Sequence, residues 1–384
     1  MANLSKKVYF PHLNGLRFVA AILVVFHHIE QYKYYAGKED IWGNVQVDNI
    51  GVKAVSVFFV LSGFLITYLL LAEHRRFGTI SLENFYVRRI LRIWPVYYLV
   101  VFLVLLLPYL IDLEALFGYR FSDKSNFIFV TLLLIMPNVT RLSVGNLIGG
   151  NQLWSIGVEE QFYIFWPICI RYFIHRLLPF LLVFIGAKFI LTIVVEVAYA
   201  ESLFSGGLHF VLEKLFFFLR IFKVEQMAIG AIGAYFLFRQ HQRIIGFINA
   251  NTTQLFTLLA IIATFVLKTK HWTYAYLEGI LFAMLIINLA TNRSLFFNLE
   301  HRLLSYLGNL SYGIYMYHTL IIALLIYLVE MLPSDASLSI NAVLYAAAPA
   351  LTILVSWISY ESFEKYFLKL KTHFMKIKSK ASAA

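Results

Sequence analysis

The chain has 384 residues, of which 60% are hydrophobic and 14% are charged, and its formal net charge is +11. A soluble globular domain carries about 25% charged residues, so a mean hydropathy of +0.75 excludes that class and indicates an integral membrane protein. The basic residues lie in short loops between apolar segments, so we expect no nucleic-acid partner. Cys169 is the single cysteine, which excludes an intrachain disulfide, and we expect no metal site and no permanently bound cofactor.

Ten apolar segments are candidates to cross a hydrocarbon core of about 30 Å, a distance that takes about 20 helical residues. They cover residues 12–30, 51–72, 92–111, 154–174, 179–199, 214–238, 253–268, 273–291, 311–332 and 342–363. A shorter run, 126–137, ends at Pro137 and predicts a half-helix or a re-entrant piece. We therefore expect an all-α, polytopic membrane helix bundle of about ten transmembrane helices.

The distribution of the 32 lysine and arginine residues predicts the orientation of these spans. Most of them fall on the cytoplasmic side if both termini are cytoplasmic, as an even number of spans requires. We expect residues 1–370 to form one transmembrane domain and residues 371–384 a basic cytoplasmic tail. The expected location is the plasma (inner) membrane, with the lipid bilayer as a partner.

The first span carries Arg17 and His28, which are eleven residues apart. Eleven residues of α-helix turn about 20° more than three full turns, so both side chains share one face, roughly 16 Å apart along the axis. His27 lies about 80° off that face. Ionisable groups inside a membrane are costly and usually serve a function. The structural alternative is that Arg17 snorkels to the headgroups while His28 caps the far end.

The second span contains Ser62-Gly63. Small residues in mid-membrane permit close approach of a neighbouring helix, and this interpretation is favoured over a catalytic serine. The next loop carries three arginines at helical spacings of three and four, namely Arg88, Arg89 and Arg92. Such a basic cap suits phosphate groups, although ordinary anchoring on the cytoplasmic side is an alternative.

The fourth span begins with Trp154 and soon carries Glu159 and Glu160. Negative charge near a helix N-terminus is stabilising, which is the structural explanation for both carboxylates. The functional hypothesis is that Glu159 lies at the depth of His28, orients its imidazole and raises its basicity.

The ninth span carries Tyr312, Tyr315 and His318 at intervals of three residues, so the three side chains share a face. Hydroxyl groups and an imidazole on one membrane-embedded face predict the lining of a polar cavity, to which Ser62 is also expected to contribute. An interfacial aromatic belt would explain the tyrosines but not His318.

Together these motifs resemble the acyltransferase-3 family of integral membrane acyltransferases. The resemblance is colinear over residues 9–370 and rests on Arg17-x10-His28, Phe59-x-Leu61-Ser62-Gly63-Phe64-Leu65-Ile66, Tyr86-x-Arg88-Arg89-x-x-Arg92-Ile93-x-Pro95, Trp154-Ser155-x-x-Val158-Glu159-x-Gln161-Phe162-Tyr163 and Ser311-Tyr312-x-x-Tyr315-x-x-His318. It implies a ten-helix bundle that takes an acyl group, often acetyl, from acetyl-CoA or another acyl-CoA. The group would pass to a hydroxyl of a carbohydrate or glycan acceptor.

The resemblance also implies roles for residues. Arg17 and His28 match the essential pair of the family, and Glu159 matches the acid of its fourth helix. The basic, acyl-CoA-binding segment corresponds to Arg88, Arg89 and Arg92. His28 would act as general base on the acceptor hydroxyl or accept the acyl group transiently, and both routes stay open. Some relatives append an extracytoplasmic hydrolase-like domain, which we do not expect in this chain.

The main alternative function is a secondary transporter or a translocase for lipid-linked glycans, which would also need intramembrane charges and polar cavities. The lack of a visible inverted repeat and the phosphate-suited arginines weigh against it. The identity of the acceptor is open at this stage.

The charge distribution makes a prediction about topology. A reporter fused after residue 384 should be cytoplasmic, and a cysteine introduced near Asp48 should react with a membrane-impermeant reagent added from outside. A reporter signal outside the cell would contradict the even number of spans.

Overall fold

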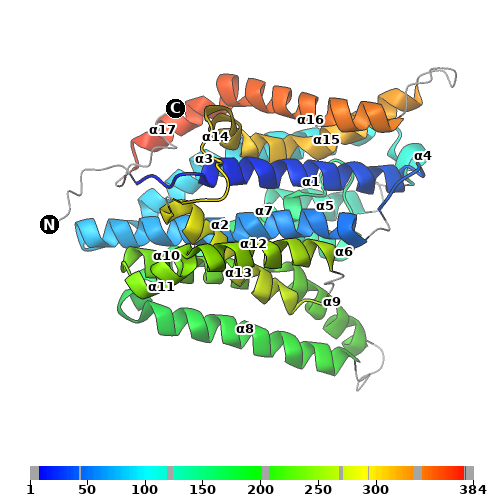
Figure 1. Cartoon of the computed structure of the whole chain (residues 1–384). Helices are drawn as coiled ribbons and strands as arrows, with labels where there is room; N and C mark the ends of the chain where they lie inside the picture. Colours follow the sequence, from blue (N-terminus) through cyan, green and yellow to red (C-terminus); the bar gives the residue numbers. More distant parts are fainter. Residues whose placement is uncertain are drawn as a thin grey trace.

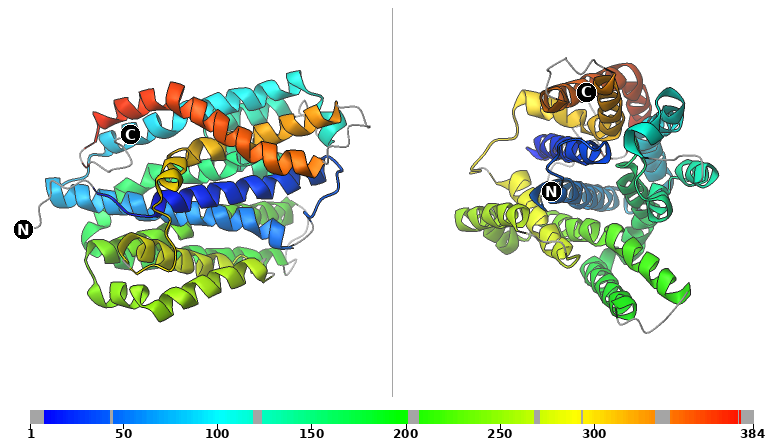
Figure 2. Two further views of the ribbon diagram at one scale, coloured as in Figure 1. Left: turned by 45° about the horizontal axis from the view of Figure 1, so that its top comes forward. Right: turned by 90° about the vertical axis from the view of Figure 1, so that its right-hand side faces the viewer.

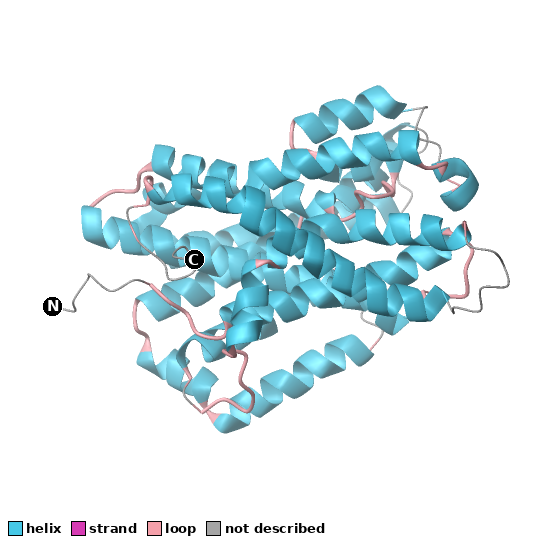
Figure 3. Ribbon diagram, turned by 90° about the horizontal axis from the view of Figure 1, so that it is seen from above, coloured by secondary structure: helices cyan, strands magenta, loops and turns pink. Residues whose placement is uncertain are grey.

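The structure, a computed structural model, describes residues 8–42, 45–118, 124–200, 207–267, 271–292, 294–331, 340–375 and 377. These residues form helices and the loops between them, and Figure 3 contains no β-strand in the part of the chain described. The helices are α1 (Leu13–Tyr35), α2 (Val45–Phe77), α3 (Leu82–Leu110), α4 (Leu113–Phe117), α5 (Ser125–Leu133), α6 (Pro137–Val144), α7 (Leu153–Phe173), η2 (Ile174–Arg176), α8 (Leu177–Ala200), α9 (Gly207–Ile221), α10 (Val224–Phe238), α11 (Gln242–Asn249), α12 (Asn251–Val266), α13 (Tyr274–Thr291), α14 (Arg302–Asn309), α15 (Ser311–Glu330), α16 (Ile340–Ser359), η3 (Tyr360–Glu364) and α17 (Lys365–Thr372).

The described part of the chain has seven helices long and apolar enough to cross a membrane, or up to eight if the bent pair α11–α12 is one span. The expected all-α membrane bundle is therefore confirmed. One of the seven is the 48-residue stretch Leu153–Ala200, which contains α7, η2 and α8. At 1.5 Å per residue this stretch would extend roughly 70 Å, more than twice a hydrocarbon core, so α7 and α8 cannot form a single crossing.

One expected span is not a continuous helix. Residues 214–238 divide at Phe222 and Lys223 into α9 and α10, each 15 residues long, so the prediction of a single helix there is wrong. The buried side chain of Lys223 lies at the break and lines a cavity. Non-helical backbone is tolerated inside a membrane protein where it lines such a space. The run 126–137 is contained in α5 and α6, two helices too short to cross.

The first helix lies in the middle of the bundle, as the view along the axis in Figure 2 shows. It packs against α2, α14, α15 and α16. Its contact face is built from small and β-branched side chains, including Ala20, Ala21, Val24 and Val25, all almost fully buried. Its polar residues are therefore enclosed by protein rather than by lipid.

Both described ends of the chain lie at the same end of the bundle. Val8 and Lys371 line one cavity, and Figure 1 shows α17 and α11 at that end, with α4 and α9 at the other. This arrangement fits an even number of crossings. The side of the membrane that this end faces remains a prediction.

The most extensive helix contact is between α2 and α10, and it depends on two glycines. A Cβ atom on Gly63 would lie 1.9 Å from the carbonyl oxygen of Met227, and one on Gly230 would lie 2.0 Å from that of Val60. Backbone atoms cannot move aside as a flexible side chain can. The small residues of the second span are therefore a close-packing site, as expected.

This contact predicts the effect of adding a methyl group. Gly63→Ala and Gly230→Ala should each destabilise the protein by about 1–3 kcal/mol, because the helices must separate to accept the new atom. Gly186→Ala on α8 is the matched control, since its Cβ would meet nothing within 4 Å. Denaturation midpoints of purified variants measure the difference, and equal midpoints for all three would contradict the close approach.

Candidate active site

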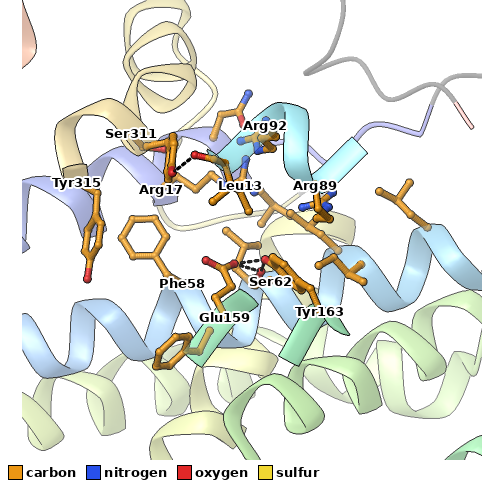
Figure 4. A pocket seen from close by; sticks show the side chains of 18 of the residues that line it. Leu13, Arg17, Phe58, Ser62, Arg89, Arg92, Glu159, Tyr163, Ser311 and Tyr315 are labelled. Atoms are coloured by element: carbon orange, nitrogen blue, oxygen red, sulfur yellow. Dashed lines mark hydrogen bonds between the residues drawn. The ribbon is translucent and has the colours of Figure 1, made fainter. Parts of the chain in front are cut away.

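A cavity of about 200 Å³ opens where α1, α2, α3, α7, α15 and α17 meet. We call it the arginine cavity; Figure 4 shows it from close by. Its polar lining includes Arg17, Ser62, Arg89, Arg92, Ser155, Glu159, Tyr163, Ser311, Tyr312, Tyr315 and Lys371. Seven of the ten residues predicted from sequence for the active site or its surroundings converge here from five helices.

The arginine cavity has an excess of positive charge. Its described lining contains four lysine or arginine side chains and one carboxylate. Neither Arg17 nor Arg92 forms a hydrogen bond or an ion pair with any described residue, and Nε of Arg89 is buried without a partner. The guanidinium of Arg89 lies 5.3 Å from the ring centre of Tyr163. Unpaired guanidinium groups that face one space are suited to an anionic ligand, phosphate above all.

The carboxylate of Glu159 is held between two hydroxyl groups. Ser62 on α2 and Tyr163, one turn further along α7, both donate hydrogen bonds to Glu159 Oε1. Figure 4 shows these three side chains together on one wall of the cavity. The carboxylate is thereby fixed toward α2.

The expected contact between Glu159 and His28 is absent from the structure. The reason lies in the segment before α7, which enters the bundle: Gly149 N–H donates to the Tyr32 hydroxyl at 2.7 Å, and Gln152 Nε2 donates to the Met316 carbonyl at 2.7 Å. The helix therefore begins inside the protein, and Glu159 lies deeper than its sequence position suggests, level with Ser62.

Arg88 is not part of the lining, unlike Arg89 and Arg92. Its guanidinium pairs with Glu73 at 3.2 Å and donates to the Phe374 carbonyl at 2.8 Å. Glu73 is buried, and a buried carboxylate needs a cation. The basic segment thus divides into one structural arginine and two that face the cavity.

His28 instead contacts His318, from α15. His318 Nδ1 lies 3.2 Å from the Ile314 carbonyl, and His28 Nδ1 lies 2.9 Å from the Val24 carbonyl and 3.1 Å from His318 Nε2. A carbonyl oxygen only accepts hydrogen bonds, so in the uncharged imidazoles each Nδ1 carries the hydrogen. The single hydrogen on His28 Nδ1 is then shared between two acceptors, the Val24 carbonyl and the lone pair of His318 Nε2. This tautomer leaves the lone pair of His28 Nε2 available.

The histidine pair lies next to the arginine cavity without lining it. Tyr315 separates the two: its hydroxyl contacts Ser155 at 2.6 Å, and its ring centre is 5.8 Å from that of His318. His27 has a different environment, with Nδ1 3.0 Å from the Val47 carbonyl and its ring against Gly51 on α2. His27 and His28 were predicted to point in different directions, and in the structure they contact different groups.

Several polar residues of the lining were not among the predicted site residues, including Ser155, Tyr163, Ser311 and Lys371. Tyr163 lies four residues after Glu159, a spacing that could have indicated it. Lys371 had no such signal, because it lies among the basic residues of the C-terminal segment. Its side chain is only 9% exposed because α17 packs against α3.

Residues 10–361 match the model of the acyltransferase-3 family, described as an acyltransferase domain. The chain therefore belongs to this family of acyltransferase enzymes. The match covers every residue predicted for the site, from Arg17 to His318.

Similar proteins include three bacterial O-acetyltransferases. The chain is 33% identical over 164 residues to a putative peptidoglycan O-acetyltransferase, YrhL, of Bacillus subtilis, a match that covers 42% of this chain and 23% of that protein. It is 31% identical over 168 residues to the peptidoglycan O-acetyltransferase OatA of Listeria monocytogenes (43% and 25%) and 30% identical over 172 residues to the O-acetyltransferase OatA of Staphylococcus aureus (44% and 26%). The match thus spans about a quarter of each relative. No solved structure matches the chain.

Proposed function

We propose that this protein transfers an acetyl group from acetyl-CoA to a hydroxyl of a glycan acceptor, in the plasma membrane. The observation that carries the proposal is the arginine cavity, with its unpaired cations, beside a pair of hydrogen-bonded imidazoles. The family supplies the reaction class, acyl transfer. The names of the relatives supply the acetyl group and the glycan.

The dimensions of the site suit an acyl-CoA. This donor carries phosphate groups at one end of a long flexible arm and a thioester at the other. Arg17 and His28 are separated by roughly 16 Å along α1. Phosphates bound by Arg17, Arg89, Arg92 and Lys371 would leave the arm to pass Tyr315 toward the histidine pair.

The tautomer of His28 defines its chemistry in this proposal. Nε2 removes the proton of the acceptor hydroxyl as its oxygen attacks the thioester carbonyl, forming a C–O bond. The C–S bond then breaks, and the thiolate takes the proton back from Nε2. In the alternative route Nε2 itself attacks the thioester, the C–S bond breaks and the thiolate leaves. The acceptor oxygen then attacks the acetyl group on Nε2, the C–N bond breaks, and the hydroxyl proton passes to the thiolate. In both routes His318 accepts the hydrogen bond from Nδ1–H and keeps the tautomer in place, the role first expected of Glu159.

The division of the arginines predicts a kinetic contrast. Arg89→Ala and Arg92→Ala should each raise the apparent KM for acetyl-CoA, because each removes a charge-assisted contact of about 1.5–3 kcal/mol with a donor phosphate. Lysine should restore only part of the affinity, since it lacks the planar fork. Arg88→Ala is the control: it should lower stability by breaking the ion pair with Glu73 and leave the KM near wild type. An equal rise in the KM for acetyl-CoA in all three variants would contradict the distinction between Arg88 and the two arginines that face the cavity.

The histidine pair predicts an ordered series of activities. His28→Ala should lose about 10²–10⁴-fold in kcat, since it removes the base. His318→Ala should also lower kcat with little change in the donor KM, and His318→Gln should recover part of the loss because an amide oxygen can accept the hydrogen bond from His28. His27→Ala should be much milder.

The measurement is product formation by purified variants of matched thermal stability. Full activity of His28→Ala would remove α1 from the catalytic step. If His318→Gln were no more active than His318→Ala, the proposed role of His318 in holding the tautomer would be refuted. The proposed role of His28 would not be affected.

A further inference from the structure

A second and larger cavity, of about 440 Å³, lies beside the C-terminal half of α1, away from the arginine cavity. The C-terminal parts of α1 and α9 contribute to it, as do the N-terminal parts of α2, α10 and α13. Residues of α6 and α8 complete this set. We call it the lysine cavity, after the lysines in its charged lining of Lys53, Lys188, Lys223, Arg141, Arg220, Glu225 and Glu278. No step of the reaction described above uses these residues.

Two of the lysines have carboxylate partners. Lys53 Nζ lies 2.6 Å from Glu278 Oε1, and Lys188 Nζ lies 2.6 Å from Glu225 Oε2. All four side chains are buried, so each pair neutralises charges that would be costly alone. These pairs account for both carboxylates of the described lining.

The remaining donors form no hydrogen bond or ion pair with a described carboxylate, although Glu225 and Glu278 lie near enough to Lys223 to act on its charge. Lys223 is 9% exposed, and its Nζ contacts only the Ser56 hydroxyl, at 3.3 Å. The guanidinium of Arg141 lies over the Trp154 ring, 5.3 Å from its centre. Nδ2 of Asn49 is buried without any hydrogen-bond partner. Two cations and an amide donor that face one cavity without an acceptor define a site for an anion.

The lysine cavity also reaches the histidine pair. His27 belongs to its lining, and the ring centre of His27 is 4.9 Å from that of His28. The rings of Trp42, Trp154 and Trp272 line the same space and offer flat apolar surfaces beside the polar groups, a combination typical of small-molecule sites. A ligand in this cavity would approach His28 past His27, whereas a ligand in the arginine cavity would approach it past Tyr315.

We propose that the lysine cavity binds the acceptor and selects an acidic one: a glycan whose carboxylate or phosphate is held by Lys223 and Arg141, with Asn49 as an additional donor. This inference rests on the proposed function for the statement that the ligand is the acceptor. The anion-binding property itself does not depend on any catalytic step.

The test compares two sugars that differ in charge and by one methyl group, N-acetylmuramic acid and its methyl ester. Their binding is measured by calorimetry with the protein in phosphatidylcholine nanodiscs. Wild type should bind the acid about tenfold more tightly than the ester, the effect expected of one charge-assisted contact. Lys223→Gln and Arg141→Gln should each bring the two affinities close together. Lys214→Gln is the matched control, because Lys214 lies on α9 outside the lining and should keep the preference.

Each outcome decides the proposal. Equal affinities in wild type, or no binding of either sugar, would overturn it, as would a preference that survives both substitutions. In nanodiscs of phosphatidylglycerol the preference should persist; its suppression would assign the cations to a lipid headgroup instead. Binding is read without turnover, so a charge preference in a protein that transfers no acetyl group would refute the proposed function and leave the anion site standing.

Discussion

A cation inside a membrane protein loses its hydration, and this loss must be offset by a partner of opposite charge. The buried arginines and lysines discussed here form two groups according to whether the protein itself supplies that partner. Arg88, Lys53 and Lys188 are each bound to a buried carboxylate, which offsets the loss of hydration. Arg17 and Arg92 have no such partner in the described structure and face a cavity instead. Unpaired intramembrane charge is expected where a ligand supplies the opposite sign. The partner of each cation therefore distinguishes structural residues from those of the site.

The rigid packing of the bundle holds the groups of the site in place. Ser62 faces the arginine cavity and bonds Glu159, while the next residue, Gly63, lies against the backbone of Met227. A close backbone contact between α2 and α10 is thus one residue away from the cavity wall. On the other side, α15 presents Tyr315 to the cavity and His318 to His28 one turn later. A small displacement of α2 or α15 would separate side chains of the site that must lie within reach of one another for the reaction.

The sequence predicted the class of fold, the polar faces of α1 and α15, and most residues of the site, because these follow from hydropathy and helical periodicity. It did not predict which helices meet at which depth. Glu159 was assigned to His28 on the assumption that α7 begins at the membrane surface, whereas the buried segment through Gly149 and Gln152 starts it inside the bundle. Lys371 was missed for a similar reason, since its burial depends on α17 folding back against α3. Contacts between segments distant in sequence have no local signal.

The two cavities give the proposed reaction a common physical basis. Both have more cationic than anionic groups in their described lining. One borders the histidine pair through Tyr315 and the other through His27. The groups that react in an acetyl transfer, a thioester and a hydroxyl, are uncharged and offer little for a protein to hold. Charges at the remote ends of donor and acceptor can provide the binding energy instead, and that energy can be used to orient the reacting atoms.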